Sequence, residues 1–428
     1  MRGDGASVAA DHASPRASGC RCRGRTERRL RSQLVSGLLS QAADSGASWV
    51  FTGSGTVLGC YRFQPDTGQL EWISERALPA KIQYAAFDPQ RRLIYVAVSD
   101  AGAGVTGAPG RLHQLHTLSL DTLPAAPRIF CEPLTLPERP IHVALDTQGA
   151  ALLIAFNRSG SIARVPLDTL GCPRNEPVTV LPAGIFTHQV LPAPNGRYVI
   201  ALSRGNAATA RREEERGSVH LYRYRAGALV ETGCHPCEPQ LGPRHLAFHP
   251  MRPWLYMAME RGNALRHHHL DEQGEPVFPA VDQVPTLREA EHGRLDRQKG
   301  GCLVCHPNGR HLYVSNRSDI IELRGGRPEL SAGENTIAVF ALDQLTGAPR
   351  LVQQLDSGGI EPRCLAIDAS GRWLIVGNQL PAWLPAAARY QPANLAVFRI
   401  DEEGRLDYHG QHQLAAYASL FWLDVLPA

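Results

Sequence analysis

The sequence predicts an all-β fold, a seven-bladed β-propeller of four-stranded blades. Three observations lead to this prediction: a composition rich in turn-forming residues, an internal repeat, and one repeat copy that is split between the two ends of the chain. The 428 residues include 40 Gly and 32 Pro, and Val, Leu and Ile fall in short runs rather than in long helical periods. Glycine and proline mark tight turns between short strands, so this composition favours a β-rich fold.

The repeat consists of six copies of a hairpin, each with a short apolar strand, a turn close to x-Pro-x-Gly-Arg, and a second strand rich in Leu, Tyr, Ile and Val. Consecutive turns lie about 47 to 62 residues apart, which is the period of a four-stranded blade with variable loops. Further strands and an Asp-containing turn follow most hairpins, as after Val339 and Val397, and complete a blade. The equivalent turn positions are Arg91, Gly149, Gly196, Arg252, Gly309 and Gly371.

A seventh copy is divided between the two ends of the repeat region. The segment from Trp49 contains two strands, a turn at Asp66–Gly68 and a last strand, but it lacks the first strand of a blade. The segment from Leu414 is a single strand with nothing after it. We expect these N-terminal and C-terminal strands to pair and close the ring, which leaves few open sheet edges and is compatible with a monomer.

Charge and hydrophobicity exclude several classes of protein. With 43% hydrophobic and 20% charged residues the chain can bury a large core, which excludes a wholly disordered protein. The net charge of +3 is too small to provide the basic field that non-specific nucleic-acid binding needs. The sequence also has no run of about 18 apolar residues that would span a bilayer. We therefore expect neither a nucleic-acid partner nor a membrane partner.

Residues 1–46 differ from the rest of the chain. They are rich in Arg, Ser and Ala and lack the apolar run of a secretory signal. We predict a disordered tail over residues 1–46, a propeller over residues 47–428, and a cytoplasmic location. The basic cluster from Arg21 to Arg31 is interpreted as a solvated segment, with binding to an acidic surface or a transit function as alternatives.

Ten cysteines are present, and two pairs have Cys-x-x-Cys spacing. Together the pairs would offer four thiolates to zinc, and Cys302–His306 matches a haem-attachment pattern. In a strand, however, residues three apart face opposite sides of the sheet, and the run His267–His269 alternates in the same way. We therefore expect reduced cysteines packed as small hydrophobes in an intracellular protein, with no metal and no cofactor. The two pairs are Cys234 with Cys237 and Cys302 with Cys305.

The repeat also predicts the position of a functional site. Residues about six before each hairpin turn and about eight after it lie at the open end of the hairpin, so they share one face of the propeller. Polar side chains at these positions must form a ring around the central axis, where we expect a small anionic ligand to bind. Four insertions, 100–110, 204–217, 319–334 and 380–393, follow second strands, and we expect them to form walls around this ring. The ring positions are Gln83, Ile141, His188, Arg244, Gly301 and Arg363, followed by Ser99, Asn157, Arg204, Glu260, Arg317 and Gln379.

An ordered set of short motifs across the blades carries a resemblance to a known family. The motifs are Pro140–Val143, Thr187–Val190, Gly242–Pro250 with Tyr256 and Glu260, His306–Arg317, and Glu361–Arg363 with Asn378 and Gln379. From about Ala47 to its end, the chain resembles the seven-bladed propeller lactonases, which include bacterial 6-phosphogluconolactonases and fungal carboxymuconate-lactonizing enzymes. It departs from the family pattern at Ser203–Asn206 and at Cys302, which leaves the substrate open.

The resemblance implies a lactonase of carbohydrate metabolism whose expected substrate is 6-phosphogluconolactone of the pentose phosphate pathway. By the same resemblance, His188, Arg244, Glu260 and Arg317 match positions of the family's active site. We expect Glu260 or His188 to accept a proton from the attacking water, and Arg244 and Arg317 to stabilise the oxyanion and the anionic substrate. The expected substrate-binding residues are Arg363, Asn157, Asn316, His245 and His142.

Two other function classes stay open at this point. One is a carboxymuconate-type cyclase or lyase, which would use the same His, Glu and Arg residues for proton transfer. The other is a non-catalytic propeller that binds a protein or peptide, because a fold alone does not fix function. Arg244 and Glu260 would then form an ion pair with a purely structural role. His142 and His245 would be histidines at strand ends whose hydrogen bonds are made within the protein.

Overall fold

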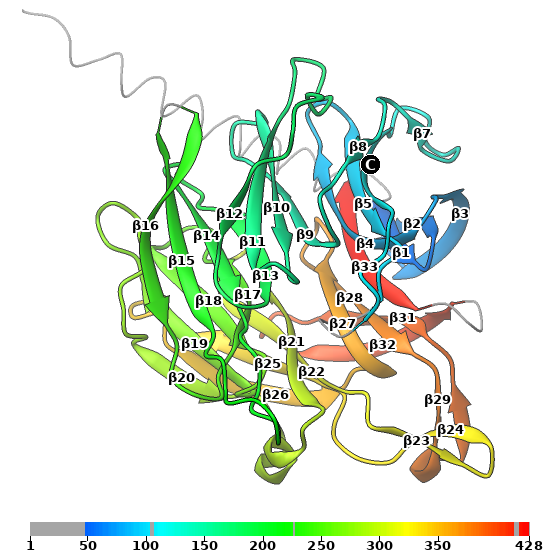
Figure 1. The fold of residues 1–428 in the computed structure, drawn as a ribbon. Coiled ribbons are helices and arrows are strands. Elements are labelled where there is room, and N and C mark those ends of the chain that lie inside the picture. Colours follow the sequence, from blue (N-terminus) through cyan, green and yellow to red (C-terminus); the bar gives the residue numbers. More distant parts are fainter. Residues whose placement is uncertain (1–47, 103–106, 226, 415–418, 428) are drawn as a thin grey trace, which may run out of the picture. The chain divides into compact units, whose positions relative to one another are not determined.

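The computed structural model describes residues 48–102, 107–225, 227–414 and 419–427. The predicted tail, residues 1–46, with its basic cluster, lies outside the described residues. Within the described part, each blade is an antiparallel sheet, and in six of the seven the strands follow one another in the chain from the innermost outward (Figure 1). Each of these six begins with the hairpin that the repeat predicts, whereas in the seventh the C-terminal strand takes the innermost place beside the first described strand.

The first four blades contain these strands, from the innermost outward: blade 1, β4 (Lys81–Asp88), β5 (Leu93–Ser99) and β6 (His113–Ser119), with β7 (Arg128–Ile129) and β8 (Leu134–Thr135) paired to β6; blade 2, β9 (Pro140–Leu145), β10 (Ala151–Phe156), β11 (Ser161–Pro166) and β12 (Val180–Pro182); blade 3, β13 (Thr187–Pro192), β14 (Tyr198–Ser203), β15 (Ser218–Arg225) and β16 (Ala228–Pro236); blade 4, β17 (Pro243–Phe248), β18 (Trp254–Met259), β19 (Ala264–His269) and β20 (Asp282–Pro285).

The last three blades contain these strands: blade 5, β21 (Gln298–Cys305), β22 (His311–Ser318), β25 (Thr336–Leu342) and β26 (Pro349–Asp356); blade 6, β27 (Ile360–Ile367), β28 (Trp373–Leu380), β31 (Asn394–Ile400) and β32 (Leu406–Gln413); blade 7, β33 (Leu420–Pro427), β1 (Ser48–Ser54), β2 (Val57–Gln64) and β3 (Gln69–Ala77). Two short 3₁₀ helices, η1 (Ala290–Arg294) and η2 (Pro385–Ala387), lie in loops.

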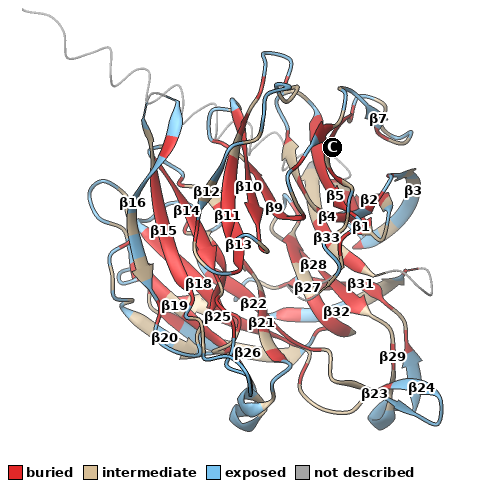
Figure 2. Cartoon of the chain, viewed as in Figure 1, coloured by how far each residue is buried: buried red, intermediate tan, exposed pale blue. Residues whose placement is uncertain are grey.

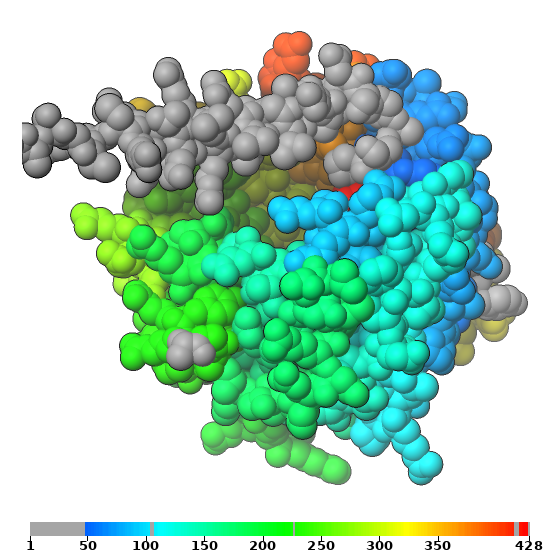
Figure 3. Space-filling view, turned by 90° about the horizontal axis from the view of Figure 1, so that it is seen from above, coloured from blue at the N-terminus to red at the C-terminus, as the bar shows by residue number. Residues whose placement is uncertain are grey.

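The innermost strands contact one another in a closed order, β4, β9, β13, β17, β21, β27, β33 and back to β4. Blade 7 closes this order, because the C-terminal strand β33 pairs antiparallel with β1 from Ser48 opposite Pro427 to Ser54 opposite Leu420. The predicted pairing of the two ends of the repeat region is therefore confirmed. In the space-filling view, the blue, cyan and green segments follow one another across one face in chain order (Figure 3).

The core lies between neighbouring blades, where the inner strands are buried along most of their length (Figure 2). A recurring tyrosine in the second strand locks each of four blades to a glycine carbonyl in a turn of the following blade. Burying a tyrosine ring is favourable only if its hydroxyl finds a partner, and these carbonyls provide one. The pairs are Tyr95 with Gly171, Tyr198 with Gly274, Tyr256 with Gly347, and Tyr313 with Gly404.

Two of the four insertions pair with each other beyond the ends of their blades. Insertions 319–334 and 380–393 pair with each other in a separate sheet of β23 (Ile321–Arg324), β24 (Arg327–Leu330), β29 (Ala382–Leu384) and β30 (Arg389–Gln391). β24 of one insertion pairs with β29 of the other, and Arg327 Cζ lies 4.0 Å from the centre of the Trp383 ring. Among the described residues, no member of the four insertions lines the central cavity, although Arg204 of insertion 204–217 pairs with Glu260 at 2.8 Å. Walls around the ring stay a prediction. No helix in the described part is both long and apolar enough to cross a bilayer.

The expectation that all cysteines are reduced is also wrong. Cys131 and Cys172 form a disulfide with a Cα–Cα distance of 5.8 Å. Cys131 follows β7 in blade 1 and Cys172 follows β11 in blade 2, so the bond ties two neighbouring blades. The two residues are 41 positions apart in the sequence, and only the packing of the blades brings them together.

Replacing Cys131 and Cys172 with serine is expected to lower the free energy of unfolding. Closing a loop of this length removes unfolded-state entropy equivalent to about 2–4 kcal/mol. Chemical denaturation of the variant should therefore match that of the reduced wild type and fall below that of the oxidised wild type. Equal stability of all three samples would show that the bond does not hold the blades together.

Candidate active site

Every innermost strand contains a β-bulge close to its start. In blade 4, for example, Pro243 pairs with Met259 and His245 with Ala258, which leaves Arg244 as the extra residue. A bulge re-aims the side chain of the extra residue, and here it does so seven times around one axis. The extra residues are Gln83, Ile141, His188, Arg244, Gly301–Cys302, Arg363 and Phe421.

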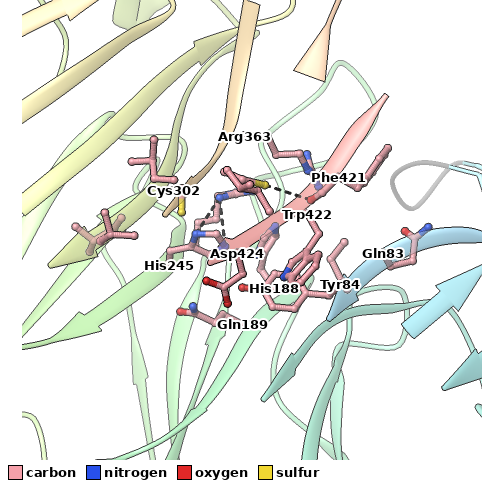
Figure 4. A pocket seen from close by; sticks show the side chains of 17 residues that line it. Gln83, Tyr84, His188, Gln189, His245, Cys302, Arg363, Phe421, Trp422 and Asp424 are labelled. Carbon is pink, nitrogen blue, oxygen red and sulfur yellow. Dashed lines mark hydrogen bonds between the residues drawn. The ribbon is translucent and has the colours of Figure 1, made fainter. Parts of the chain in front are cut away.

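These bulges build one central cavity of about 190 Å³. All of the bulge residues except Gly301 line it, and Figure 4 labels Gln83, His188, Cys302, Arg363 and Phe421 among the lining side chains. Of the twelve predicted ring positions, five of the six before the turns line this cavity, whereas Gly301 and the six positions after the turns do not. A cavity of this volume has room for a small molecule rather than for a peptide segment. Its further lining residues include Tyr84, Gln189, His245, Cys364, Trp422 and Asp424.

Arg363 presents an unpaired guanidinium to the cavity. It lies over the Phe421 ring at 4.7 Å, but it makes no hydrogen bond or ion pair with any residue that the structure describes. Such a group can bind a carboxylate or phosphate through two parallel hydrogen bonds. Of the predicted substrate-binding residues, Arg363 has the placement best suited to that role.

Two histidines face each other beside Arg244. The rings of His188 and His245 lie 5.2 Å apart in a T-shaped arrangement, and Arg244 Nη1 is 3.2 Å from Nδ1 of His245. Burial, followed by the Arg244 charge, lowers the pKa of both histidines well below 6.5. Both rings are therefore neutral at neutral pH and offer a ligand hydrogen-bonding nitrogens rather than charge. His188 Nδ1 is buried without a partner among the described residues.

Glu260 lies behind this cavity and is held by three arginines. Its carboxylate is 2.8 Å from Arg204, 2.8 Å from Arg244 and 3.0 Å from Arg317, and the residue is only 2% exposed. Burial alone would raise the pKa of Glu260, but the three positive charges outweigh it and hold the pKa well below 4.5. A carboxylate stabilised in this way is a weak proton acceptor and a strong anchor for the arginines.

The remaining predicted residues do not line the cavity. Arg317 also pairs with Glu361, and Asn316 donates to the Thr286 carbonyl and to Thr336. His142 packs on the Tyr84 ring with centroids 4.2 Å apart, and burial lowers its pKa to about 3. Asn157 is buried after β10, and its carbonyl oxygen finds no partner among the described residues.

Asp424 is the one carboxylate that lines the cavity within the described chain. It comes from the closing strand β33, and its side chain accepts a 2.8 Å hydrogen bond from the neighbouring Val425 amide. Burial raises the pKa of Asp424 to about 6. Asp424 was not among the predicted site residues, although an acidic residue inside the apolar run Leu420–Leu426 indicates a functional position.

The two Cys-x-x-Cys pairs do not combine into a zinc site. Cys234 lies on the outer strand β16 of blade 3, whereas Cys302 and Cys305 lie on the inner strand β21 of blade 5. The three consecutive histidines in β19 each contact a different partner: His267 contacts Asp282, His268 the Val277 carbonyl, and His269 the Thr346 carbonyl. Neither motif therefore converges on one ion.

Seven blades surround a central cavity lined by arginine and histidine side chains, which defines the protein as a β-propeller with a polar site at its centre. The family model described as lactonase, 7-bladed beta-propeller, matches residues 48–384, and the chain belongs to this family. It is accordingly a lactonase, a hydrolase that opens cyclic esters.

Individual relatives agree with this assignment. The 6-phosphogluconolactonase of Bacillus subtilis (strain 168) is 25% identical over 354 residues, which cover 81% of this chain and 89% of that protein. The 6-phosphogluconolactonase of Yersinia pestis (strain Pestoides F) is 24% identical over 341 residues, which cover 78% and 85% of the two chains. The structure of a periplasmic gluconolactonase of Pseudomonas aeruginosa has the same fold, with a TM-score of 0.69, 21% identity, and coverage of 89% of this chain and 99% of that chain.

Glu260→Gln is expected to destabilise the fold by about 3 kcal/mol, because it leaves buried arginines without their counter-charge. The matched control is Glu71→Gln, which breaks an exposed pair with Arg62 and should cost less than about 1 kcal/mol. Urea denaturation at neutral pH measures both changes. A lowered carboxyl pKa stabilises the folded state above its ordinary value of 4.5, so the difference from wild type should shrink as the pH falls below 4.5. Equal costs for the two variants would contradict the anchoring role.

Proposed function

We propose that the protein hydrolyses 6-phosphogluconolactone, a sugar-derived lactone that carries a phosphate group. The observation that carries this proposal is the unpaired Arg363 guanidinium in a small central cavity that is also lined by the carboxyl group of Asp424. Relatives that align with most of this chain bear the name 6-phosphogluconolactonase, which supports the same substrate.

Lactone hydrolysis needs three groups in one place. A base takes a proton from the attacking water, positive charge stabilises the oxyanion that develops on the lactone carbonyl, and a further cation binds the anionic end of the substrate. The cavity supplies all three kinds of group at the bulge positions and just beyond them. In this proposal Arg244 stabilises the oxyanion and Arg363 binds the phosphate.

The base in this proposal is Asp424, in place of the Glu260 or His188 that the family resemblance implies. Glu260 is committed to Arg204, Arg244 and Arg317 and does not line the cavity. Asp424 lines the cavity, and a pKa near 6 lets it accept a proton at neutral pH and return it during turnover. His188 lies beside it in the cavity and orients the water or the leaving oxygen (Figure 4).

A cytoplasmic location and a monomeric state stay predictions. The Cys131–Cys172 disulfide is typical of proteins from oxidising compartments, which argues against the cytoplasm. A role in the pentose phosphate pathway follows from the proposed substrate, because opening the ring of 6-phosphogluconolactone yields a phosphorylated sugar acid.

Purified protein is expected to hydrolyse 6-phosphogluconolactone faster than the spontaneous reaction, measured by proton release with the background subtracted. Arg363→Ala should raise KM for this substrate by about tenfold to a hundredfold, because a charge-assisted contact to the phosphate is lost. The same variant should change the hydrolysis of gluconolactone, which has no phosphate, much less.

Arg350→Ala removes an exposed arginine on β26 and serves as the matched control. If wild type only tracks the background, the 6-phosphogluconolactone proposal fails, and unphosphorylated lactones and unsaturated dicarboxylic acids become the next substrates. If Arg363→Ala slows both lactones equally, the guanidinium does not bind the phosphate.

Asp424→Asn is expected to lower kcat/KM by about 10²–10⁴ and to stabilise the fold. In the wild type kcat/KM should rise as the pH passes through about 6, where the base loses its proton, and this step should vanish in the variant. A raised carboxyl pKa destabilises the folded state above about pH 6, a penalty that is relieved as the pH falls toward 3.8. The variant should therefore gain about 1–3 kcal/mol at neutral pH.

Asp407→Asn, an exposed change on β32, should alter neither rate nor stability and provides the control. Full activity of Asp424→Asn would remove this residue from the mechanism without affecting the lactonase proposal itself.

A further inference from the structure

The outer strands of blade 3 carry a cluster of metal-binding side chains away from the central cavity. His220 lies on β15, and Glu231 and Cys234 lie on β16. One ligand atom from each of these residues lies within 4.8 Å of the other two. The proposed lactone chemistry does not use any of them.

A β-bulge places the three side chains on one face of the sheet. Cys234 stands directly opposite His220, whereas Tyr222, two residues further along β15, pairs with Glu231. In a regular strand, residues three apart such as Glu231 and Cys234 would face opposite sides. The extra residue at Thr232 restores the match, so Glu231 and Cys234 both face the same side as His220.

The neighbours of His220 hold its ring in position. Nδ1 is 2.7 Å from Glu231 Oε1, and Nε2 is 2.8 Å from Ser218 Oγ and 3.8 Å from Cys234 Sγ. Gly184 packs against the ring so closely that a Cβ there would lie 2.6 Å from Nε2 and 2.7 Å from Ser218 Oγ. The backbone at Gly184 thus packs against the side of the ring that contacts Ser218.

Exposure differs across the cluster in a way that suits an ion arriving from solvent. His220 is 7% exposed, whereas Glu231 and Cys234 are both exposed. A buried imidazole with two accessible ligands, one a carboxylate and one a thiol, leaves an open position for water.

We propose that His220, Glu231 and Cys234 bind a zinc ion on the outer strands of blade 3. Imidazole nitrogen, thiolate sulfur and carboxylate oxygen are the donors that zinc takes, and the thiolate disfavours magnesium and calcium. Binding converts the Cys234 thiol to a thiolate, and its proton passes to solvent. Ser218 contacts Nε2 of the ring and helps to keep the imidazole oriented.

The proposal is tested by titrating the full chain with zinc chloride and measuring the heat of binding by calorimetry. One equivalent is expected to bind, and loading with cobalt(II) should give a thiolate-to-metal charge-transfer absorption. Cys234→Ser should abolish this absorption, and Glu231→Gln should weaken zinc binding by at least about tenfold. Both residues are exposed, so these variants should fold like the wild type.

Cys237→Ala removes the other thiol of the same Cys-x-x-Cys pair and is the matched control, with unchanged zinc binding expected. Hydrolysis of the lactone should be equal with and without zinc, so the result does not depend on the proposed function. The proposal is overturned if no equivalent binds, or if binding and the cobalt absorption survive in Cys234→Ser, which would assign them to other residues of the chain.

Discussion

The β-bulge in the innermost strand of each blade is the constraint on which the central site depends. A regular strand would point alternate residues into the spaces between blades, where the apolar core needs them. The extra residue in each bulge releases one side chain from that alternation and turns it toward the axis. Because the ring repeats the bulge in every blade, Arg244, Arg363 and His188 meet in one cavity although they lie on three different sheets.

The charge network behind the cavity follows from the same geometry. Second strands end where first strands begin, so Glu260 stands directly behind the bulge residue Arg244 and pairs with it, and Arg317 pairs with Glu260 in turn. Several arginines buried close together would repel one another, and Glu260 is the carboxylate that Arg204, Arg244 and Arg317 share. The network fixes Arg244 at the cavity wall, while Arg363 stays free for an anion.

Much of this arrangement was predictable because it depends on spacing along one hairpin. The distance from the turn placed Gln83, His188, Arg244 and Arg363 at one level of the ring, and the split copy predicted the pairing of β1 with β33. Asp424 was missed because its strand lacks the hairpin turn from which the other positions were counted. Glu260 was predicted as a base because a motif shows which residue is present but not how many arginines surround it.

The sequence by itself determined the all-β architecture, the number of blades and the level at which polar side chains gather, because these depend on contacts between residues close together in the chain. Only the tertiary structure decided the partners across blades. The Cys131–Cys172 disulfide, the sharing of Glu260 by three arginines, the pairing of two insertions with each other, and the entry of Asp424 into the cavity all join segments that are distant in the chain. Such contacts are fixed by how the blades pack around the axis. The local sequence does not show which distant residues this packing brings together.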